Sequence, residues 1–506
     1  MAHQVTVRDR ELAKLRFAKS AGVAVPSNVE FADSLGPAER ADWAGGTVLR
    51  KPTRTLSGVA VVAVMTAPAA CSHGRCTYCP GGLERGTPQS YTGEEPSALR
   101  GAQFQWDARA ITEHRLAALE ATGHSTSKVE VIVMGGTFPA RPRAYQETVI
   151  RGVFDGLNGA PSASLAEAQI QNEVGAHRCV SLTVETRPDW CGPEVLPWLL
   201  DAGVTRVELG VECLTDPVLE AVNRAHRSTD VVDATRDARN AGLKVAYHWM
   251  LGLPGMDPER DAADFARLFD DPSYRPDMLK IYPTLVIPGT ALHDDWKAGR
   301  YEPYDTETAV KLLARLKARL PRWVRIQRIQ RDIPARLIAA GVRAGNVREL
   351  ALARLREQGL RCPCLRCREP GRRATPEPSR FVPWETSYEA SGGVEWFLSL
   401  EDPETETVGG FLRLRLPPEH GGFGPDGPII RELKVLGPET PVGSPAPEGG
   451  YQHRGFGRAL LARAEGIARE SGARRLFVTS AVGTREYYRA LGFGRDGPYY
   501  AKPLFS

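Results

Sequence analysis

Short runs of β-branched residues alternate with amphipathic stretches through residues 57–290, and this alternation limits the possible folds more than any other feature. Strands are predicted over Gly58–Met65, Val129–Met134, Val180–Val184, Arg206–Leu209, Val245–Met250 and Met278–Tyr282. The helices between them include Ala98–Ala121, Pro193–Ala202 and Thr229–Ala241. Such alternation produces a parallel sheet, because each helix returns the chain to the start of the next strand. The sequence therefore predicts an α/β fold that begins with a full or partial (β/α) barrel, with ligands at the carboxyl ends of its strands.

Three cysteines, Cys71, Cys76 and Cys79, directly follow the first predicted strand in CSHGRCTYCPGG. Three thiolates so close together can hold three irons of a [4Fe–4S] cluster and leave the fourth iron free to bind a reactant. A structural zinc is the alternative. It needs four protein ligands, however, and no further cysteine follows until Cys179.

The cysteine loop resembles that of the radical S-adenosylmethionine (SAM) enzymes, in which it follows the first barrel strand. In that superfamily the open iron binds the amino and carboxylate groups of SAM, and an electron from the cluster cleaves SAM to a 5′-deoxyadenosyl radical. The x4-then-x2 spacing of these cysteines departs from the commoner x3-then-x2 pattern. The superfamily also has a glycine-rich turn beside the SAM amino group, and Gly135 and Gly136 follow the second predicted strand at that place.

The third predicted strand ends near Glu185, and Arg187 follows it. A carboxylate at a strand end can bind ribose hydroxyls, and an arginine can pair with a carboxylate through two hydrogen bonds. An isolated acid in such a place is more often a helix cap. Because these residues follow a cluster loop and a glycine turn in the order of the superfamily, we assign them with Gly135 and Gly136 to SAM binding.

The composition is that of a globular protein with more than one domain. At 506 residues the chain exceeds what one hydrophobic core usually serves, and 42% of its residues are hydrophobic and 25% charged. The N-terminal segment is polar and unlike a secretion signal, and no apolar run is long enough for a membrane span. Nine cysteines, six of them in two clusters, fit metal binding in a reducing compartment, so we expect a cytoplasmic protein. Cys179, Cys191 and Cys213 are isolated, and we expect them to be buried.

Positive charge is concentrated in one segment. The net charge is +4, but residues 301–380 carry 19 Lys and Arg against 8 Asp and Glu, an excess of +11 that leaves −7 for the rest. Such a segment favours a docking surface for a polyanion such as nucleic acid. Arginines also recur in it at every third residue, which fits a solvated helix or strand face equally well: Arg322, Arg325, Arg328 and Arg331. A basic N-terminal arm adds Arg8, Arg10, Lys14, Arg16 and Lys19.

A second cysteine cluster consists of Cys362, Cys364 and Cys367, with x1-then-x2 spacing. Disulfides are not expected in the cytosol, and a zinc ion needs one further ligand, for which His420 is the candidate. We expect a structural zinc that fixes the linker between two domains, and a second redox cluster is the alternative.

From about residue 379 the pattern changes to a hairpin, with a turn at Pro403–Thr405, and a further strand in IIRELKVLG. A helix then opens with Gln452-His453-Arg454-Gly455-Phe456-Gly457. Successive backbone N–H groups at a helix start can bind a diphosphate. With the strand RLFVTS and the closing GTREYYRALGF, this Q-x-x-G-x-G/A pattern resembles the coenzyme A turn of the GNAT acetyltransferases. The resemblance places Tyr487 and Tyr488 near the thioester, and core packing of one of them is the alternative.

Longer stretches narrow the resemblance. The runs CSHGRCTYCPGG, KVEVIVMGGTFPARPRAYQ, VETRPDW, VELGVECL and LKIYPTLVIPGTALHDDWKAGRY together resemble the catalytic subunit of Elongator in its prokaryotic form, and the likeness continues to the C-terminus. The sequence departs from that family at Glu212, where glutamine is usual, and at Lys434, where histidine is usual. Prokaryotic members also carry a zinc at the second cysteine cluster.

This resemblance implies an enzyme that modifies tRNA. The SAM-derived radical takes hydrogen from the methyl group of acetyl-CoA, the acetyl radical adds to C5 of the wobble uridine, and thioester hydrolysis leaves 5-carboxymethyluridine. Lys280 and Tyr282, at a late strand end, would then orient the acetyl group or the uracil, and a salt bridge with a packed ring is the alternative. The competing function is a protein lysine acetyltransferase with a structural cluster. A catalytically silent RNA-binding scaffold would not account for two cofactor sites.

Four regions follow from these patterns: a basic tRNA-binding arm over 1–55, a radical SAM barrel over 56–320, a basic linker with the zinc site over 321–378, and a GNAT-type domain over 379–506. The expected cofactors are a [4Fe–4S] cluster, SAM, acetyl-CoA as co-substrate and zinc. The expected partners are tRNA and an electron donor for the cluster, and a homodimer is left open.

Overall fold

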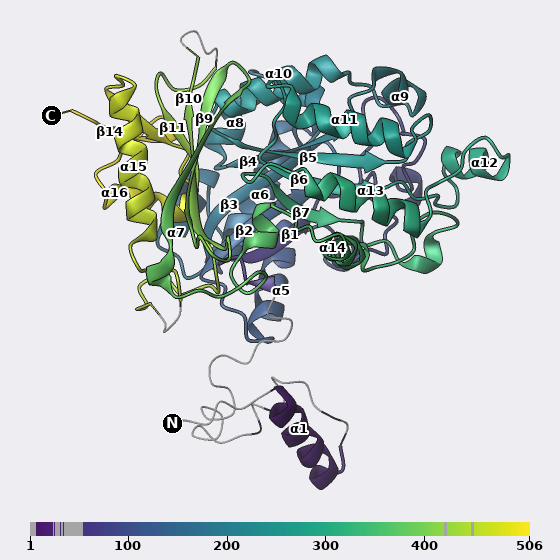
Figure 1. Ribbon diagram of the computed structural model, residues 1–506, viewed down its shortest axis with the longest axis horizontal. Helices are drawn as coiled ribbons and strands as arrows, with labels where there is room; N and C mark the ends of the chain where they lie inside the picture. The colour runs from purple at the N-terminus through teal and green to yellow at the C-terminus, as the bar shows by residue number, and fades with distance from the viewer. Residues whose placement is uncertain are drawn as a thin grey trace.

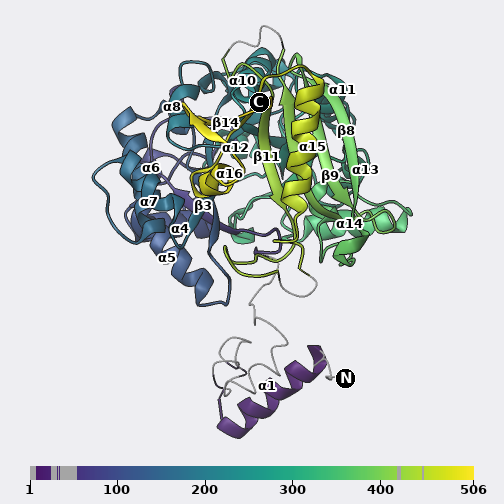
Figure 2. The ribbon, with the colours of Figure 1, turned by 90° about the vertical axis from the view of Figure 1, so that its left-hand side faces the viewer.

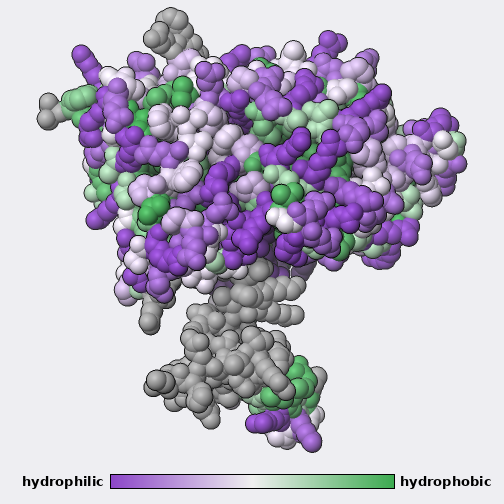
Figure 3. All heavy atoms as spheres, in the orientation of Figure 1, coloured by the Kyte–Doolittle hydropathy of each residue, from purple (hydrophilic) through white to green (hydrophobic). Residues whose placement is uncertain are grey.

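The computed structural model describes residues 7–23, 25, 31, 34, 54–418, 423–446 and 450–505. Two seven-stranded sheets form the body of the protein, one from the first part of the chain and one from the last (Figure 1). Helix α1 (Val7–Ala21) lies apart from both sheets in the two ribbon views (Figures 1 and 2). The face shown in Figure 3 is largely hydrophilic, with small apolar patches scattered over it. Within the described ranges, none of the helices is long and apolar enough to cross a membrane.

The first sheet is parallel, and its strands follow chain order. They are β1 (Ala60–Met65), β2 (Lys128–Met134), β3 (Arg178–Thr186), β4 (Arg206–Glu212), β5 (Lys244–Leu251), β6 (Met278–Pro283) and β7 (Arg325–Ile329). Because β1 and β7 form the two edges, the barrel is partial. All seven residues of β4 are buried, as expected of a strand with helices on one side and packed side chains on the other. The predicted α/β barrel is confirmed in its partial form.

Most of the helices of this part of the chain connect consecutive strands. They are α4 (Pro96–Gln103), α5 (Ala108–Glu120), α6 (Arg143–Asn158), α7 (Leu165–Glu173), α8 (Leu196–Asp201), α9 (Asp216–Ala221), α10 (Ser228–Asn240), α11 (Pro258–Asp270), α12 (Ala291–Lys297), α13 (Thr306–Ala318) and α14 (Val347–Glu357). The single helix predicted over Ala98–Ala121 is wrong, because α4 and α5 are separate. Gln105 and Trp106 adopt positive φ between them, and the Asp107 side chain caps α5. The Trp106 ring packs so closely on Gly101 that a Cβ there would lie 2.5 Å from it, so α4 accommodates the turn only with glycine.

The barrel extends beyond the boundary predicted at residue 320. Strand β7 pairs in parallel with β6, and α14 packs against α13. The arginine repeat therefore runs through an edge strand of the barrel and the turns on either side of it, and not through a linker.

The second sheet has the strand order β13-β14-β12-β11-β10-β9-β8, antiparallel except between β11 and β12. Its strands are β8 (Val382–Ala390), β9 (Gly393–Glu401), β10 (Val408–Leu416), β11 (Ile429–Val435), β12 (Arg475–Val478), β13 (Gly494–Asp496) and β14 (Tyr499–Pro503), and its helices are α15 (Phe456–Glu470) and α16 (Arg485–Arg489). The predicted hairpin is confirmed as β9 and β10, with Pro403–Thr405 in its turn. Strands β11 and β12 pair over only two residues each and then separate.

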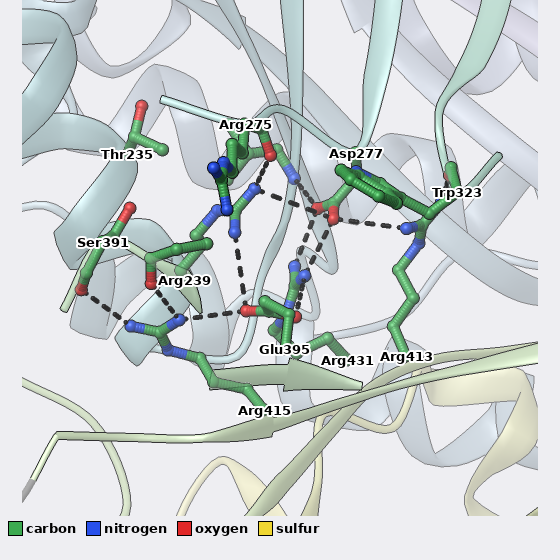
Figure 4. A network of polar contacts seen from close by, with 12 residues as sticks. Thr235, Arg239, Arg275, Asp277, Trp323, Ser391, Glu395, Arg413, Arg415 and Arg431 are labelled. Carbon is green, nitrogen blue, oxygen red and sulfur yellow. Dashed lines mark hydrogen bonds and ion pairs between the residues drawn. The ribbon is translucent and has the colours of Figure 1, made fainter. Parts of the chain in front are cut away.

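A buried ion cluster joins the two sheets (Figure 4). Asp277, just before β6, accepts two hydrogen bonds from Arg431 of β11, at 2.7 and 2.8 Å. Glu395 of β9 pairs with the same arginine and with Arg415 of β10. All four side chains are at most 1% exposed, so these charges attract one another in the interior, where water screens them little. The cluster therefore fixes the second sheet against the barrel.

Candidate active site

The cysteine loop begins at the carboxyl end of β1. Cys76 and Cys79 are buried, Cys71 is half-buried, and all three are free thiols. The Ser90 N–H donates to Cys79 Sγ at 3.1 Å, and Arg224 Nη1 lies 3.9 Å from Cys76 Sγ. The loop thus presents three thiols at the end of the barrel where ligands bind.

These thiols fit an iron–sulfur cluster better than a single ion. Among the described residues, their sulfur atoms do not all lie within 4.8 Å of one another, whereas those of the second cysteine cluster do. Each cysteine of a [4Fe–4S] cluster binds a different iron, so a wider spacing is expected. Burial raises the pKa of Cys71 to about 11, so a cluster must displace its proton. Burial also raises the pKa of Cys76, and the Arg224 guanidinium beside it acts in the opposite direction, toward the thiolate form that the cluster requires.

A cavity opens beside this loop at the carboxyl ends of the strands, and we call it the C-terminal cavity. It brings together six of the predicted site residues: Cys71, Gly136, Glu185, Arg187, Lys280 and Tyr282. Gly135 lies just behind it, and its N–H donates to Glu185 Oε2 at 3.3 Å. Gly135 and Gly136 have φ of 124° and 109°, and a Cβ on Gly135 would lie 2.3 Å from Thr66 Oγ1. The turn therefore requires glycine.

A carboxylate that the sequence analysis missed holds Lys280 in this cavity. Glu208 of β4 is fully buried, pairs with Lys280, and accepts a hydrogen bond from His248 Nε2 at 3.1 Å. Glu185 lies 3.8 Å from Lys280 Nζ. Burial alone would raise the pKa of Glu208, but Lys280 and His248 hold it well below its usual value. The available signal for Glu208 was a carboxylate between the apolar residues Val207 and Leu209 of a predicted strand.

Tyr282 and Arg187 take more restricted positions than predicted. The Tyr282 ring meets the His248 ring edge to face, with centroids 5.8 Å apart. The Arg187 guanidinium pairs in bidentate fashion with Asp189 of its own turn, and it also contacts His73 of the cysteine loop. Arg187 therefore lines the cavity with its guanidinium already paired to a carboxylate of the protein.

A second cavity, which we call the N-terminal cavity, lies between the sheets at the amino ends of the barrel strands and has a volume of about 650 Å³. The barrel side of its wall includes Lys128, Thr205, Arg206 and Lys244. The other side includes most of the predicted coenzyme A residues, namely Gln452, His453, Gly455, Phe456, Gly457, Tyr487 and Tyr488. A volume of this size is ordinary for a cofactor site.

The predicted coenzyme A turn has the backbone of an anion site. His453 and Gly455 adopt φ of 64° and 86°, and Gly455 is the residue that precedes α15. No atom lies within 4 Å of the place where a Gly455 Cβ would be. The turn therefore places backbone N–H groups at a helix start, where they have no intrahelical partner, next to open space, which suits a diphosphate.

Two residues of the turn do not match their predicted role. Gln452 is buried, and its side chain accepts hydrogen bonds from Lys128 Nζ at 2.7 Å and from the Thr440 N–H at 3.0 Å. Its Nε2 donates to Gly58 O at 3.4 Å. Gln452 thus ties the turn to the barrel and has little left for a ligand. Arg454 is not among the residues lining the cavity, and its Nε donates to Gly450 O.

The two tyrosines differ in exposure. Tyr488 is 5% exposed and packs against Phe493, so the core-packing alternative holds for it. Tyr487 is 39% exposed, and its Oη would lie 3.0 Å from a Cβ on Gly457. Tyr487 is therefore the tyrosine placed beside the turn.

A chain of ion pairs connects the two cavities through the barrel. Arg206 lies 3.4 Å from Glu208, which faces the C-terminal cavity, and 2.6 Å from Glu130, which faces the N-terminal cavity. Glu130 in turn lies 3.5 Å from Lys434 of β11. Lys434, one of the two departures from the family pattern, therefore has a partner. The other, Glu212, pairs with Arg224 at 3.5 Å beside the cysteine loop.

The second cysteine cluster has the compactness of a single-ion site. The sulfurs of Cys362, Cys364 and Cys367 all lie within 4.8 Å of one another. Lys317 is fully buried beside them, with Nζ 3.7 Å from Cys367 Sγ. His420, the candidate fourth ligand, lies outside the described residues. The isolated Cys179, Cys191 and Cys213 are buried, as predicted.

The arginine repeat is largely neutralised by the protein itself. Arg325 is 8% exposed and pairs with Glu369, so its predicted contact with nucleic acid is wrong. Arg322 pairs with Glu401 and Glu406 of the second domain. Arg328 and Arg331, in contrast, line the C-terminal cavity. The prediction for Arg325 failed because side chains alternate between the two faces of a strand, so residues three apart point to opposite faces.

Comparisons with known proteins give a family match for both the barrel and the second domain. The model of the radical SAM superfamily matches residues 67–267, that of the radical SAM C-terminal domain residues 276–357, and that of the GNAT acetyltransferase family residues 371–493. A tRNA uridine(34) acetyltransferase of Methanocaldococcus jannaschii is 45% identical over 495 residues, which cover 96% of this chain and 91% of the relative. Human Elongator complex protein 3 is 43% identical, over 90% of this chain and 86% of its own. The solved structure of the archaeal Elp3 of Methanocaldococcus infernus, with residues 1–46 deleted, is 41% identical with a TM-score of 0.77, over 89% of this chain and 100% of that one.

Proposed function

Since the chain belongs to the family of the tRNA uridine(34) acetyltransferases and Elongator complex protein 3, we propose that it converts the wobble uridine of tRNA to 5-carboxymethyluridine with SAM and acetyl-CoA. The observation that carries this proposal is the pair of cavities at opposite ends of the same barrel strands. A protein lysine acetyltransferase would need only the cavity at the coenzyme A turn. That alternative is not favoured, because Cys71 and Glu185 line a cavity that it would leave without a use.

The residues of the C-terminal cavity take defined roles in this proposal. When bound by Cys71, Cys76 and Cys79, the cluster supplies the electron that cleaves SAM. The Gly135–Gly136 turn leaves room for the amino end of SAM, and Glu185 presents a carboxylate at the strand end. Lys280, held by Glu208, offers its ammonium group to a carbonyl oxygen of the uracil. The salt bridge, given above as the alternative role of Lys280, thus holds its ammonium group in place for the substrate.

The tRNA would approach the open side of the C-terminal cavity. Arg331 lies over the Tyr91 ring at 5.6 Å, and the 33% exposed side chain of Arg328 pairs with Asp332. Both line the cavity and are the arginines of the repeat best placed to meet phosphates. The basic N-terminal arm over 1–55 remains part of this proposal.

Replacing Arg328 and Arg331 together by alanine should weaken the binding of all tRNAs alike. If each neutralises one phosphate, the slope of log K against log salt should fall by up to about two. A binding titration across salt concentrations measures it. Arg236 and Arg300 also pair with a nearby acid but lie on the surface away from this cavity, so their double alanine variant is the control. An equal slope in all three proteins would exclude these arginines from the tRNA interface.

Replacing Gly455 by leucine should raise the Kd for acetyl-CoA at least about tenfold, or ~1.4 kcal/mol. The side chain would fill the space in front of the N–H groups, and its positive φ adds strain. Modification of tRNA should fall accordingly, while SAM cleavage continues in the separate cavity. Calorimetry with acetyl-CoA and release of 5′-deoxyadenosine measure the two effects.

Gly472 provides a matched control for this variant. It follows the other end of α15, has φ of 79° and also has open space at its Cβ position. Gly472→Leu therefore introduces the same strain away from the cavity and should leave the Kd unchanged. Unaltered affinity in Gly455→Leu, or equal losses in both variants, would remove the turn from coenzyme binding.

We also propose a structural zinc at Cys362, Cys364 and Cys367. Tetrahedral Zn–S bonds of about 2.3 Å place sulfurs about 3.8 Å apart, which fits their observed grouping. The three cysteines, the cluster thiols and the tRNA substrate support a cytoplasmic protein. An external electron donor completes the proposed reaction.

A further inference from the structure

Lys244 is a buried lysine of the N-terminal cavity that the proposed roles do not use. It is the first residue of β5, is 6% exposed, and lines the same cavity as Gly455, Gly457 and Tyr487. Among the described residues, its ammonium group makes no hydrogen bond and no ion pair within 4.0 Å. A buried ammonium group normally has such partners, so this one has capacity for a ligand.

Three other cations of the cavity wall, from β2, β4 and β11, already have partners. Arg206 pairs with Glu130, Lys434 lies 3.5 Å from the same carboxylate, and Lys128 donates to Gln452 and to Thr440 O. The charged groups that face Lys244 come from three elements packed against it: Glu432 and Lys434 of β11, Arg206 of β4 and Glu130 of β2. Glu130 thus serves other cations, Glu432 pairs with Arg413 at 2.9 Å, and Lys244 is left facing the cavity.

The environment also makes Lys244 a stronger acid than an ordinary lysine. Burial lowers its pKa to about 8, and Arg206 and Lys434 act in the same direction against the opposing effect of Glu432. A group with a pKa near the working pH is the most effective proton donor.

The position of Lys244 in the cavity indicates which end of coenzyme A would contact it. A coenzyme A molecule with its diphosphate on the turn before α15 would extend its pantetheine arm into the cavity, whose barrel side carries Lys244. The residues Leu433, Lys434 and Val435, beyond the paired part of β11, line this cavity. The thioester, at the far end of the arm, is then the part that meets the barrel.

We propose that Lys244 is a catalytic residue that binds the thioester carbonyl and protonates the departing sulfur of coenzyme A. This inference rests on the proposed function, because it requires acetyl-CoA in the N-terminal cavity. A water oxygen bonds to the carbonyl carbon, the C–S bond breaks, and its electron pair goes to sulfur. The Lys244 ammonium gives its proton to that sulfur, and the proton lost by the water restores the ammonium. The products are a carboxylic acid and the thiol of coenzyme A, so atoms and charges balance.

The test compares Lys244→Met and Lys244→Arg with the wild-type protein in the complete reaction with tRNA, SAM and acetyl-CoA, with release of coenzyme A thiol as the readout. Lys244→Met should lower the rate about 10²-fold, as expected for loss of a general acid, while calorimetry shows the coenzyme still bound. The wild-type rate should be constant below about pH 8 and fall above it, since only the protonated form acts. Lys244→Arg keeps the charge and should retain part of the rate without that fall. Lys297→Met, an exposed lysine of α12, is the control and should behave as wild type.

The outcomes separate this inference from the proposed function. If the wild-type protein binds no acetyl-CoA or releases no thiol, the proposed function fails. If wild type is active and both Lys244 variants retain its rate and its pH profile, the role of Lys244 is overturned. Acetylation of Lys244 itself, detected by mass spectrometry in place of thioester hydrolysis, would also overturn it.

Discussion

Cys76→Ala protein, reconstituted anaerobically with iron and sulfide, is expected to hold no [4Fe–4S] cluster and to release no 5′-deoxyadenosine from SAM. Each of the three loop cysteines must bind a different iron, so the loss of one leaves the cluster with two protein ligands. The loss of activity should be complete. Iron content, the visible absorption of the cluster and 5′-deoxyadenosine by chromatography measure it.

Cys213→Ala is the matched control for this variant. Cys213 is also buried and free, but it belongs to neither cysteine cluster. Its loss should leave the iron content and SAM cleavage at the wild-type level. A Cys76→Ala protein that is folded by circular dichroism and still cleaves SAM would contradict the assignment of the loop.

Asp277→Asn should destabilise the protein by about 3–5 kcal/mol, the usual effect of removing one partner of a buried ion pair. The carboxylate accepts two hydrogen bonds from Arg431 and lies 3.5 Å from Arg413, and both arginines are at most 1% exposed (Figure 4). Without it, their charges are buried and poorly compensated. Urea unfolding, followed by tryptophan fluorescence, measures the free energy of unfolding.

Asp233→Asn tests whether the effect depends on burial. Asp233 pairs with Arg236 at 2.7 Å on the exposed side of α10, so its loss should change stability by less than about 1 kcal/mol.

Burial would raise the pKa of Asp277, but Arg431 and Arg413 hold it well below its ordinary value of 3.8. The contribution of Asp277 is therefore present above pH 3.8 and is lost as the pH falls below it. Equal, small effects of both variants would show that the cluster does not hold the domains together.

The residues that share a local pattern were predictable from the sequence. The barrel strands, the cysteine loop and the glycine turns each depend on neighbouring residues whose spacing sets their structure. Gly135 and Gly455 are examples, because their φ values of 124° and 86° are backbone conformations that glycine adopts far more readily than other residues.

The residues whose role depends on distant partners were not predictable in this way. Arg325 follows the same spacing as Arg328, but it pairs with Glu369, a contact between segments far apart in the chain. Gln452 has the position of a ligand residue, yet Lys128 of the barrel occupies its side-chain oxygen. Glu208 and Lys244 lie in strands that read as core, and only the packed barrel shows that both face cavities.

The central claim is that the two cavities act together on tRNA, and carbon tracing tests it most directly. The reconstituted protein is incubated anaerobically with tRNA, SAM, a reductant and acetyl-CoA labelled at both acetyl carbons. Nucleosides from the tRNA and peptides from the protein are then analysed by mass spectrometry. The account predicts 5-carboxymethyluridine at the wobble position with both labelled carbons, formed only when SAM is present. Label on lysine side chains, with none in the tRNA, would contradict it.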